Sequence, residues 1–442
     1  MSSWTPPSDF TLAQPDVRQA DAAYRRWLMW AYAVVIGCLT FNFALAFINT
    51  NVARISETHV ILSELVLLSA GLALAANRKA SLYTVLALFF GYMTLILALR
   101  PEFDQKAIRD IIIPIAFYFI GRGMRSIEDA DRLIIICAVI VVSVGLFEFL
   151  LLDVFTGLVN IFQYYVARGS LSADDNFVAG STLFISSTRV GGRYFLAFLG
   201  DIRASSVFLE PVTMGNFGAF LFLWALFRTD MRFRYGLFAL AVTVIILGDA
   251  RFGMIVCLAF AAVAPFYRAV PKLIWALLPF AIMVSLALYG GWTRETTWED
   301  DLPGRVLHAA LLMVRLTPES TFGIAADLPF LDDNGYAYTL SQIGLIGMAS
   351  LWFLFVFAPQ GRDEAFRFKA LAVTYICLLM TVSNSFYSIK LAALFWLAAG
   401  AADAWAPKPA AEAPKADERD LALSGPVARL RRDFAWPGTT SP

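Results

Sequence analysis

The sequence predicts an all-α, polytopic integral membrane protein with about 12 transmembrane helices. Of its 442 residues 59% are hydrophobic and only 16% are charged. Apolar runs of about 20 residues, the length of one membrane crossing, recur from Trp27 to Ala404. A soluble domain carries about a quarter charged residues, and an outer-membrane barrel gives only short, alternating apolar segments. Both of those classes are therefore excluded.

The apolar runs, taken in chain order, give 12 candidate crossings. They are 27–47, 59–76, 81–99, 111–121, 133–152, 212–227, 236–248, 252–267, 273–290, 338–358, 370–384 and 389–405. The fourth, seventh and eleventh runs are short, so we expect tilt or a broken helix there.

The distribution of basic residues predicts the orientation, because Lys and Arg are enriched in cytoplasmic loops. With both termini inside, the cytoplasmic segments hold 22 of the 35 Lys and Arg residues. We therefore expect a cytoplasmic N-terminal segment 1–26, a transmembrane domain 27–405 and a disordered cytoplasmic tail 406–442, which is rich in Pro, Ala and charge. Two long loops, 153–211 and 291–337, then face the other side, where long loops are usually functional.

The composition argues against several kinds of site. Acidic and basic residues balance at 35 each, so no basic field for nucleic acid is expected. There are only two histidines, His59 and His308, and the four cysteines lack metal-ligand spacing, so we expect no metal and no cofactor. Within the runs Glu64, Glu148 and Lys390 look isolated, unlike the chain of buried acids in a proton-driven carrier.

The first long loop carries a candidate anion site. Arg193 and Arg203 are followed by Glu210 and Pro211, and proline suits the first turn of a helix. Glu210 would then lie near the positive end of the dipole of the sixth run. The alternative is a capped helix start in which Arg203 simply pairs with Glu210.

Two shorter charged segments could join this site. Asp249 and Arg251 form a tight turn between the seventh and eighth runs, where ionisable residues are costly and often functional; the alternative is a local pair that anchors the turn. The segment Arg100–Asp110 precedes the fourth run and could equally mark a membrane boundary. Gly344 and Gly347, in the tenth run, predict close helix packing.

The second long loop predicts a helix with a basic face. After Pro303, a spacing of about 100° per residue puts Arg305, His308 and Arg315 within roughly one quarter of the helix circumference. Such a face suits a diphosphate, because arginine forks match phosphate oxygens, but it could also meet lipid headgroups. Asp333, before the tenth run, could bind a metal or orient hydroxyls, or merely form a solvated turn.

The order of these motifs, between about residues 81 and 358, resembles the O-antigen polymerase and O-antigen ligase superfamily of bacterial envelope glycosyltransferases. The matching segments are Arg100–Pro114, Arg203–Pro211, Asp249–Gly253, Gly323-Ile324, Asp333–Tyr336 and Gly344–Gly347. The family favours a serine before the arginine at Arg251, where this chain has Ala250.

The resemblance implies a GT-C-like enzyme of the bacterial inner membrane whose donor and acceptor are polyprenyl-diphosphate-linked glycans at the periplasmic face. A chain-length regulator and a flippase are implied partners, besides membrane lipids. Arg203 and Arg251 would bind diphosphate or glycan, with Arg193 and Arg305 as lesser candidates. Glu210, or else Asp333, would deprotonate the acceptor hydroxyl.

Ligases of this family carry a histidine in the second long loop, shortly before the next span. Here Tyr336 and Tyr338 occupy that neighbourhood, so Tyr336 becomes a candidate for substrate binding and His308 lies too early. This departure favours a repeat-unit polymerase for exopolysaccharide or O-antigen over a ligase. Two other hypotheses about function stay open: a 12-helix secondary transporter and a non-catalytic partner in envelope assembly.

Overall fold

The computed structural model describes residues 17–76, 80–100, 105–175, 180–189, 191–297, 301–325, 331 and 334–406. The predicted tail 406–442, apart from Ala406, lies outside the described residues, as do residues 1–16 of the N-terminal segment. All the elements below belong to the unit Met1–Trp405.

Within the described residues the structure contains sixteen α-helices and no β-strand, which confirms the all-α prediction for this part of the chain. Twelve helices each overlap one predicted run: α1 (Val17–Asn51), α2 (Glu57–Ala75), α3 (Ala80–Leu99), α4 (Gln105–Gly123), α5 (Ile127–Leu150), α8 (Pro211–Phe227), α9 (Arg234–Leu247), α10 (Arg251–Val263), α11 (Lys272–Trp292), α14 (Gly335–Phe357), α15 (Ala365–Met380) and α16 (Ile389–Ala404). The first long loop holds α6 (Leu152–Leu158), α7 (Ile161–Ala167) and the short 3₁₀ turn η3 (Ser206–Phe208); the second holds α12 (Leu302–Arg315) and α13 (Pro318–Thr321).

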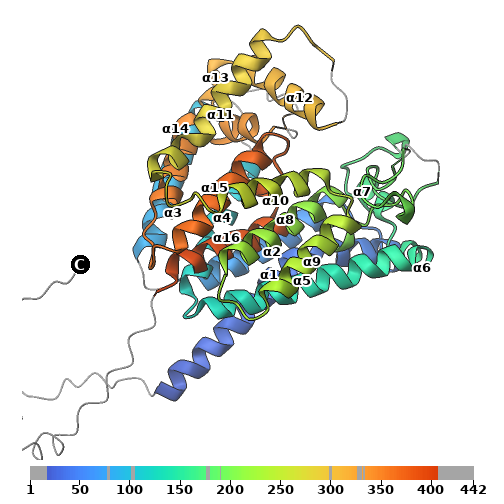
Figure 1. Cartoon of the computed structure of the whole chain (residues 1–442), viewed down its shortest axis with the longest axis horizontal. Helices are drawn as coiled ribbons and strands as arrows, with labels where there is room; N and C mark the ends of the chain where they lie inside the picture. The colour runs from blue at the N-terminus through green and yellow to red at the C-terminus, as the bar shows by residue number, and fades with distance from the viewer. Residues whose placement is uncertain are drawn as a thin grey trace, which may run out of the picture. The chain divides into compact units, whose positions relative to one another are not determined.

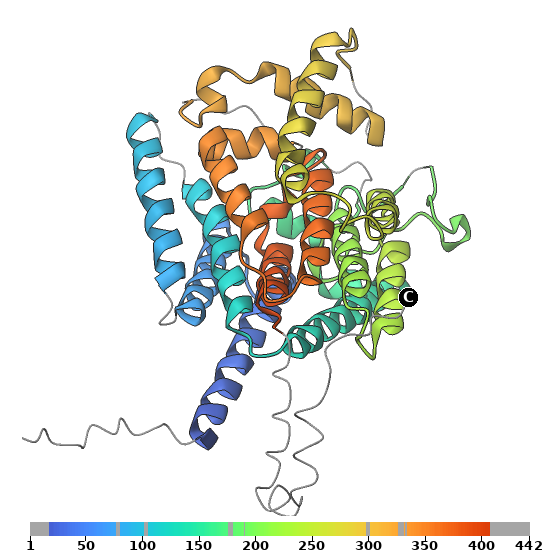
Figure 2. The same ribbon diagram turned by 60° about the vertical axis from the view of Figure 1, so that its left-hand side comes forward.

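Six of these helices, α1, α2, α3, α5, α11 and α14, are long and apolar enough to cross a membrane by length and composition. Their outer faces carry apolar side chains without protein cover: Leu88 of α3 is 67% exposed and Leu95 is 58% exposed. Contiguous apolar surface of this kind is avoided by soluble proteins. The chain is therefore described as a multi-pass α-helical membrane protein. In Figures 1 and 2 the first turns of α1 project beyond the neighbouring helices.

Helix α16 forms the centre of the bundle, because every residue from Ile389 to Asp403 is buried (Figure 1). It packs most tightly against α4. A Cβ atom added at Gly121 would overlap the carbonyl oxygen of Leu397, and one at Gly400 would overlap the carbonyl oxygen of Tyr118. The two glycines therefore let the two backbones approach directly, as small residues do between membrane helices.

Helix α14 is interrupted at Gly344, which has a positive φ of 67°. From the sequence we expected a broken helix only in the short fourth, seventh and eleventh runs, and for Gly344 we expected close helix packing. The structure corrects this: the helix is interrupted at Gly344, and the freed backbone groups are satisfied by Tyr92 of α3 and by Arg100, which directly follows α3. Arg100 donates to the carbonyl oxygen of Ser341 (2.6 Å), while Tyr92 donates to that of Ile343 (2.7 Å) and accepts from the N–H of Gly347 (3.1 Å).

Candidate functional site

Four arginines gather where the first long loop meets the turn between α9 and α10. They are Arg189, Arg193, Arg203 and Arg251, arranged around Asp249, and we call this group the basic cluster. Three of them, Arg193, Arg203 and Arg251, were predicted from the sequence. Their convergence depends on the loop folding back onto the helix ends, which the following contacts explain.

Arg193 and Arg203 attach the loop to the C-terminal end of α9. Arg193 donates from Nη2 to the carbonyl oxygens of Ile246 and Leu247, and Arg203 donates from Nε to that of Gly248 at 2.9 Å. The last carbonyls of a helix have no partner within the helix and carry partial negative charge, so cations bind well there. Both side chains are more than nine-tenths buried.

Asp249 organises the other half of the basic cluster. It is fully buried with φ of 43°, and its Oδ1 accepts from the backbone N–H groups of Tyr194 (2.8 Å) and Phe195 (2.7 Å). Its Oδ2 pairs with Nε of Arg189 at 2.7 Å. Arg251 instead stacks on the exposed ring of Tyr194, 4.7 Å from its centroid. A local Asp249–Arg251 pair, the alternative considered above, is therefore not formed.

The basic cluster carries more positive than negative charge. Burial, together with the neighbouring Arg189, lowers the pKa of the Arg203 guanidinium to about 9, and burial also lowers the pKa of Arg193. Asp249 is the one carboxylate that the described structure pairs with these four arginines. An anion placed beside Arg251 and Arg189, the two arginines that stay partly exposed, would therefore relieve unfavourable repulsion.

Glu148 of α5 holds the segment between Arg203 and Glu210. It is fully buried and accepts hydrogen bonds from the N–H of Ser205 (2.8 Å), the hydroxyl of Ser205 (2.8 Å) and the N–H of Ser206 (2.6 Å). Ser206 has a positive φ of 51°, a conformation that costs energy for a residue with a side chain. Glu148 thus stabilises a strained turn that directly follows Arg203.

Glu210, the predicted base, precedes α8 and is bound on both oxygens. Tyr165 donates to Oε1, Thr213 donates to Oε2 at 2.8 Å, and Nζ of Lys390 lies 3.5 Å from Oε1. Burial alone would raise the pKa of Glu210, but Lys390 and the two hydroxyl donors outweigh it, so the pKa lies below its usual value. Its side chain is still 27% exposed. The alternative pair between Glu210 and Arg203 is not formed.

Two groups of paired charges overturn the prediction that Glu64 and Lys390 are isolated. Lys390 pairs with Glu210, as described above. Glu64 pairs with Arg109 at 2.8 Å, and Arg109 also pairs with Asp110 at 2.8 Å. Asp110 accepts in turn from the hydroxyl of Tyr338 at 2.5 Å. Glu148 is not isolated either, as described above. Charges far apart in sequence meet because α4 packs against both α2 and α16, and because Tyr338 of α14 reaches Asp110 of α4.

The predicted basic face of the second loop lies on α12. This helix begins at Leu302, before the predicted start, so that Pro303 lies in its first turn. Asp301 is its N-cap and accepts from the N–H of Gly304 at 2.8 Å. Arg305 and His308 are partly buried and Arg315 is exposed. The helix packs on α11 and α14, whereas the basic cluster is built on α9 and α10. Their joint action on one ligand stays a prediction.

The two remaining predicted residues differ in outcome. Asp333 lies outside the described residues. Tyr336, expected to bind substrate, is fully buried, and its hydroxyl donates to the carbonyl oxygen of Cys377 at 2.9 Å. This position indicates a packing role, and the neighbouring Tyr338 is the tyrosine that contacts charged groups.

Sequence reasoning did not single out Arg189, Tyr165 or Lys390. It named Arg109 and Asp110 only as part of the segment Arg100–Asp110, which could join the site or mark a membrane boundary. Lys390 carried a usable signal, because a lysine within an apolar run is costly unless it is paired. Tyr165 carried none, since a tyrosine in a loop has no pattern that indicates a carboxylate partner.

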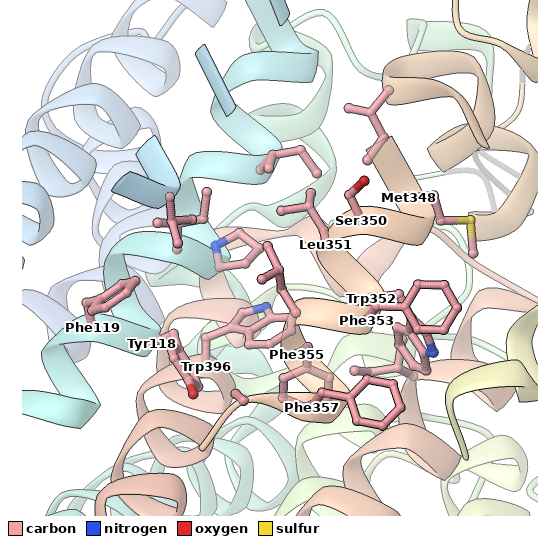
Figure 3. A pocket seen from close by; sticks show the side chains of 18 of the residues that line it. Tyr118, Phe119, Met348, Ser350, Leu351, Trp352, Phe353, Phe355, Phe357 and Trp396 are labelled. Atoms are coloured by element: carbon pink, nitrogen blue, oxygen red, sulfur yellow. The ribbon is translucent and has the colours of Figure 1, made fainter. Parts of the chain in front are cut away.

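A separate apolar pocket of about 600 Å³ lies between α3, α4, α14, α15 and α16. None of the arginines of the basic cluster lines it. Figure 3 shows Tyr118, Phe355 and Trp396 gathered on one side of this pocket.

Comparison with known proteins finds no matching family model, no matching curated protein and no matching solved structure. Among the described residues no group of three or more His, Cys, Asp or Glu side chains could hold a metal ion. The class that the helices define is a multi-pass membrane protein, and its function must be argued from the basic cluster and the charges around Glu210.

Proposed function

We propose that the chain crosses the bacterial inner membrane 12 times with both termini in the cytoplasm. In this topology the C-terminal ends of α5 and α9 and the N-terminal ends of α8 and α10 lie on the periplasmic side, together with both long loops. The basic cluster then faces the periplasm, while the basic-rich loops face the cytoplasm as expected.

On this basis we propose a GT-C-like glycosyltransferase that polymerises polyprenyl-diphosphate-linked oligosaccharide repeat units into exopolysaccharide or O-antigen. The observation that carries the proposal is the excess of positive charge in the basic cluster. Arginine forks suit diphosphate oxygens, and fixed cations stabilise negative charge as it develops on a leaving group. Ligase-type transfer of a finished glycan would use the same donor and is the nearest alternative.

The reaction would be a single displacement. The acceptor hydroxyl oxygen bonds to the anomeric carbon of the donor sugar, and the bond from that carbon to the diphosphate breaks with both electrons passing to the diphosphate. The hydroxyl proton passes to a carboxylate, with Glu210 as first candidate and Asp333 as second. A carboxylate of lowered pKa is a weak base, so Glu210 suits a step in which the hydroxyl becomes acidic as it bonds to carbon.

Arg251 gives the sharpest test, because it stacks on Tyr194 and does not hold the end of a helix. For purified Arg251→Ala supplied with the lipid-linked repeat unit, we expect the polymerisation rate to fall about 100-fold, as for loss of one charge-stabilising donor. The polymerisation rate of Arg203→Ala should fall at least as far, because this substitution also loosens the first long loop. Arg232→Ala, exposed at the opposite end of the helices, is the control. Wild-type polymer from both Arg203→Ala and Arg251→Ala at normal expression would refute the assignment.

A secondary transporter is the second candidate, because α14 is interrupted and charged side chains lie among the helices, as in many carriers. One observation argues against a transporter. The backbone carbonyls freed at Gly344 accept hydrogen bonds from Arg100 and Tyr92, so they are not left to bind a substrate or ion. Reconstitution into vesicles separates the two functions. A ladder of polymer supports the enzyme, whereas flux of the lipid-linked unit without new glycosidic bonds supports the carrier.

A further inference from the structure

The apolar pocket has the depth of one membrane leaflet. Along α4 its wall runs from Ile111 to Arg122, which is about 16 Å at ~1.5 Å per residue. One leaflet of the hydrocarbon core is about 15 Å deep, half of the ~30 Å total. The pocket volume of about 600 Å³ lies within the ~300–1,000 Å³ typical of ligand sites. A single extended hydrocarbon chain matches this shape.

The two ends of the pocket differ in charge. At the end near Ile111 the lining hydroxyls of Thr339 and Tyr387 hydrogen-bond to each other at 2.7 Å. They therefore have little hydrogen-bonding capacity left for a ligand. At the other end lies Arg122, the one charged residue among the described residues that line the pocket. Among the described residues its guanidinium hydrogen-bonds through Nη1 alone, to Tyr118 (3.3 Å) and to the carbonyl oxygen of Pro359 (3.2 Å).

One buried polar group on the pocket wall has no hydrogen-bond partner among the described residues. The ring of Trp396 lies between the two ends of the pocket, because its centroid is 5.1 Å from that of Phe355 and 5.5 Å from that of Phe386, the neighbour of Tyr387. Trp396 lines the pocket, and its buried Nε1–H has no hydrogen-bond partner among the described residues. Tyr118 is fixed nearby, because its hydroxyl donates to Asp403 at 2.7 Å. The mainly apolar pocket thus has a cation at one end and an unpaired N–H donor farther along its wall.

We propose that this pocket binds one acyl chain of an anionic phospholipid, with the phosphate at Arg122 and an ester carbonyl near Trp396. The inference rests on the orientation given under the proposed function, which puts Arg122 at the cytoplasmic surface. The lipid then comes from the cytoplasmic leaflet. It is distinct from the polyprenyl donor, whose diphosphate would lie at the basic cluster on the opposite side of the membrane.

The test is the lipid content of the purified full-length chain. Protein is extracted in mild detergent, and bound lipid is counted per chain by mass spectrometry for the wild type and three variants. Arg122→Gln removes the charge, and Leu351→Trp fills the pocket while leaving Arg122 intact. Arg125→Gln is the matched control, because Arg125 lies three residues away, pairs with Asp21 at 2.7 Å and does not line the pocket.

We expect about one anionic phospholipid per wild-type chain and per Arg125→Gln chain, and a roughly tenfold lower content in Arg122→Gln, as for loss of a charge-assisted hydrogen bond. Leu351→Trp should lose the lipid as well. Adding phosphatidylglycerol, but not phosphatidylcholine, should raise the unfolding temperature of the delipidated wild type and not that of Leu351→Trp. A polyprenyl lipid in the pocket, no retained lipid, or equal retention by Arg122→Gln would overturn the proposal. These readouts do not require polymerase activity, so they stand apart from the proposed function.

Discussion

Glu210 and Lys390 show how a charged pair is stabilised at the edge of an apolar bundle. The carboxylate keeps its charge because the ammonium group, Tyr165 and Thr213 together offset the cost of burial. A group whose pKa is lowered on folding stabilises the folded state above its unfolded pKa, and this contribution is lost as pH falls through the folded pKa.

Glu210→Gln should therefore change the pH dependence of stability. At neutral pH we expect a loss of about 1–3 kcal/mol, because Lys390 loses its counter-charge. The difference from wild type should stay constant down to the unfolded pKa of about 4.3 and shrink on further acidification. Thermal unfolding in detergent from pH 7.5 to pH 3.5 measures it, with exposed Asp153→Asn as control. A difference that grows on acidification would contradict the lowered pKa.

Glu148 supports the turn after Arg203 with three hydrogen bonds. Glu148→Ala leaves two buried N–H groups without an acceptor, so we expect about 2–4 kcal/mol of destabilisation. Glu148→Gln keeps an acceptor oxygen and should recover part of that loss. Thermal unfolding of both variants checks the order, and equal stability of Glu148→Ala and wild type would show that the turn holds without this side chain.

Helices α4 and α16 depend on glycine in a way that most of the other helices do not. Their backbones touch at Gly121 and Gly400, whereas Gly91 of α3 has nothing within 4 Å of an added Cβ atom. Close backbone contact gains dispersion energy only if no side chain intervenes. The same contact fixes the level of Trp396 relative to Arg122.

Gly400→Ala should separate α4 from α16. The added methyl group would overlap the carbonyl oxygen of Tyr118, and overpacking of this kind costs about 1–3 kcal/mol. Gly91→Ala adds the same methyl group to an open helix surface and should be neutral or slightly stabilising. Unfolding temperatures in one detergent compare the pair. Equal temperatures for Gly400→Ala and Gly91→Ala would contradict the tight contact.

The topology of the entire chain can be tested with cysteine labelling, because Cys38, Cys137, Cys257 and Cys377 are all free and buried. Background labelling should accordingly be low. In cells with a permeabilised outer membrane, an impermeant maleimide should label Thr297→Cys and not Arg232→Cys. Arg232→Cys should react only after the inner membrane is opened. Labelling of both positions, or of Arg232→Cys alone, would refute the proposed 12-span orientation.

The helices were readable from sequence because a long apolar run satisfies its own backbone hydrogen bonds and needs no distant partner. Each predicted run accordingly falls on a helix. The arginines at 193, 203 and 251 were also found, since charge next to an apolar run is conspicuous. The break at Gly344 was not found, because nothing local distinguishes it from the packing glycine Gly347.

Contacts between residues far apart in the sequence could not be predicted in this way. Lys390 looked isolated because its partner, Glu210, lies 180 residues earlier in the chain, and Tyr336 looked available because its burial depends on the position of α15. A local pair of Asp249 with Arg251 was one alternative from the sequence, but Asp249 contacts Arg189, since the loop folds back over the end of α9. Local patterns carry information about burial and charge, whereas such contacts arise only when the helices pack, which brings together side chains whose spacing in the sequence predicts nothing about their distance in space.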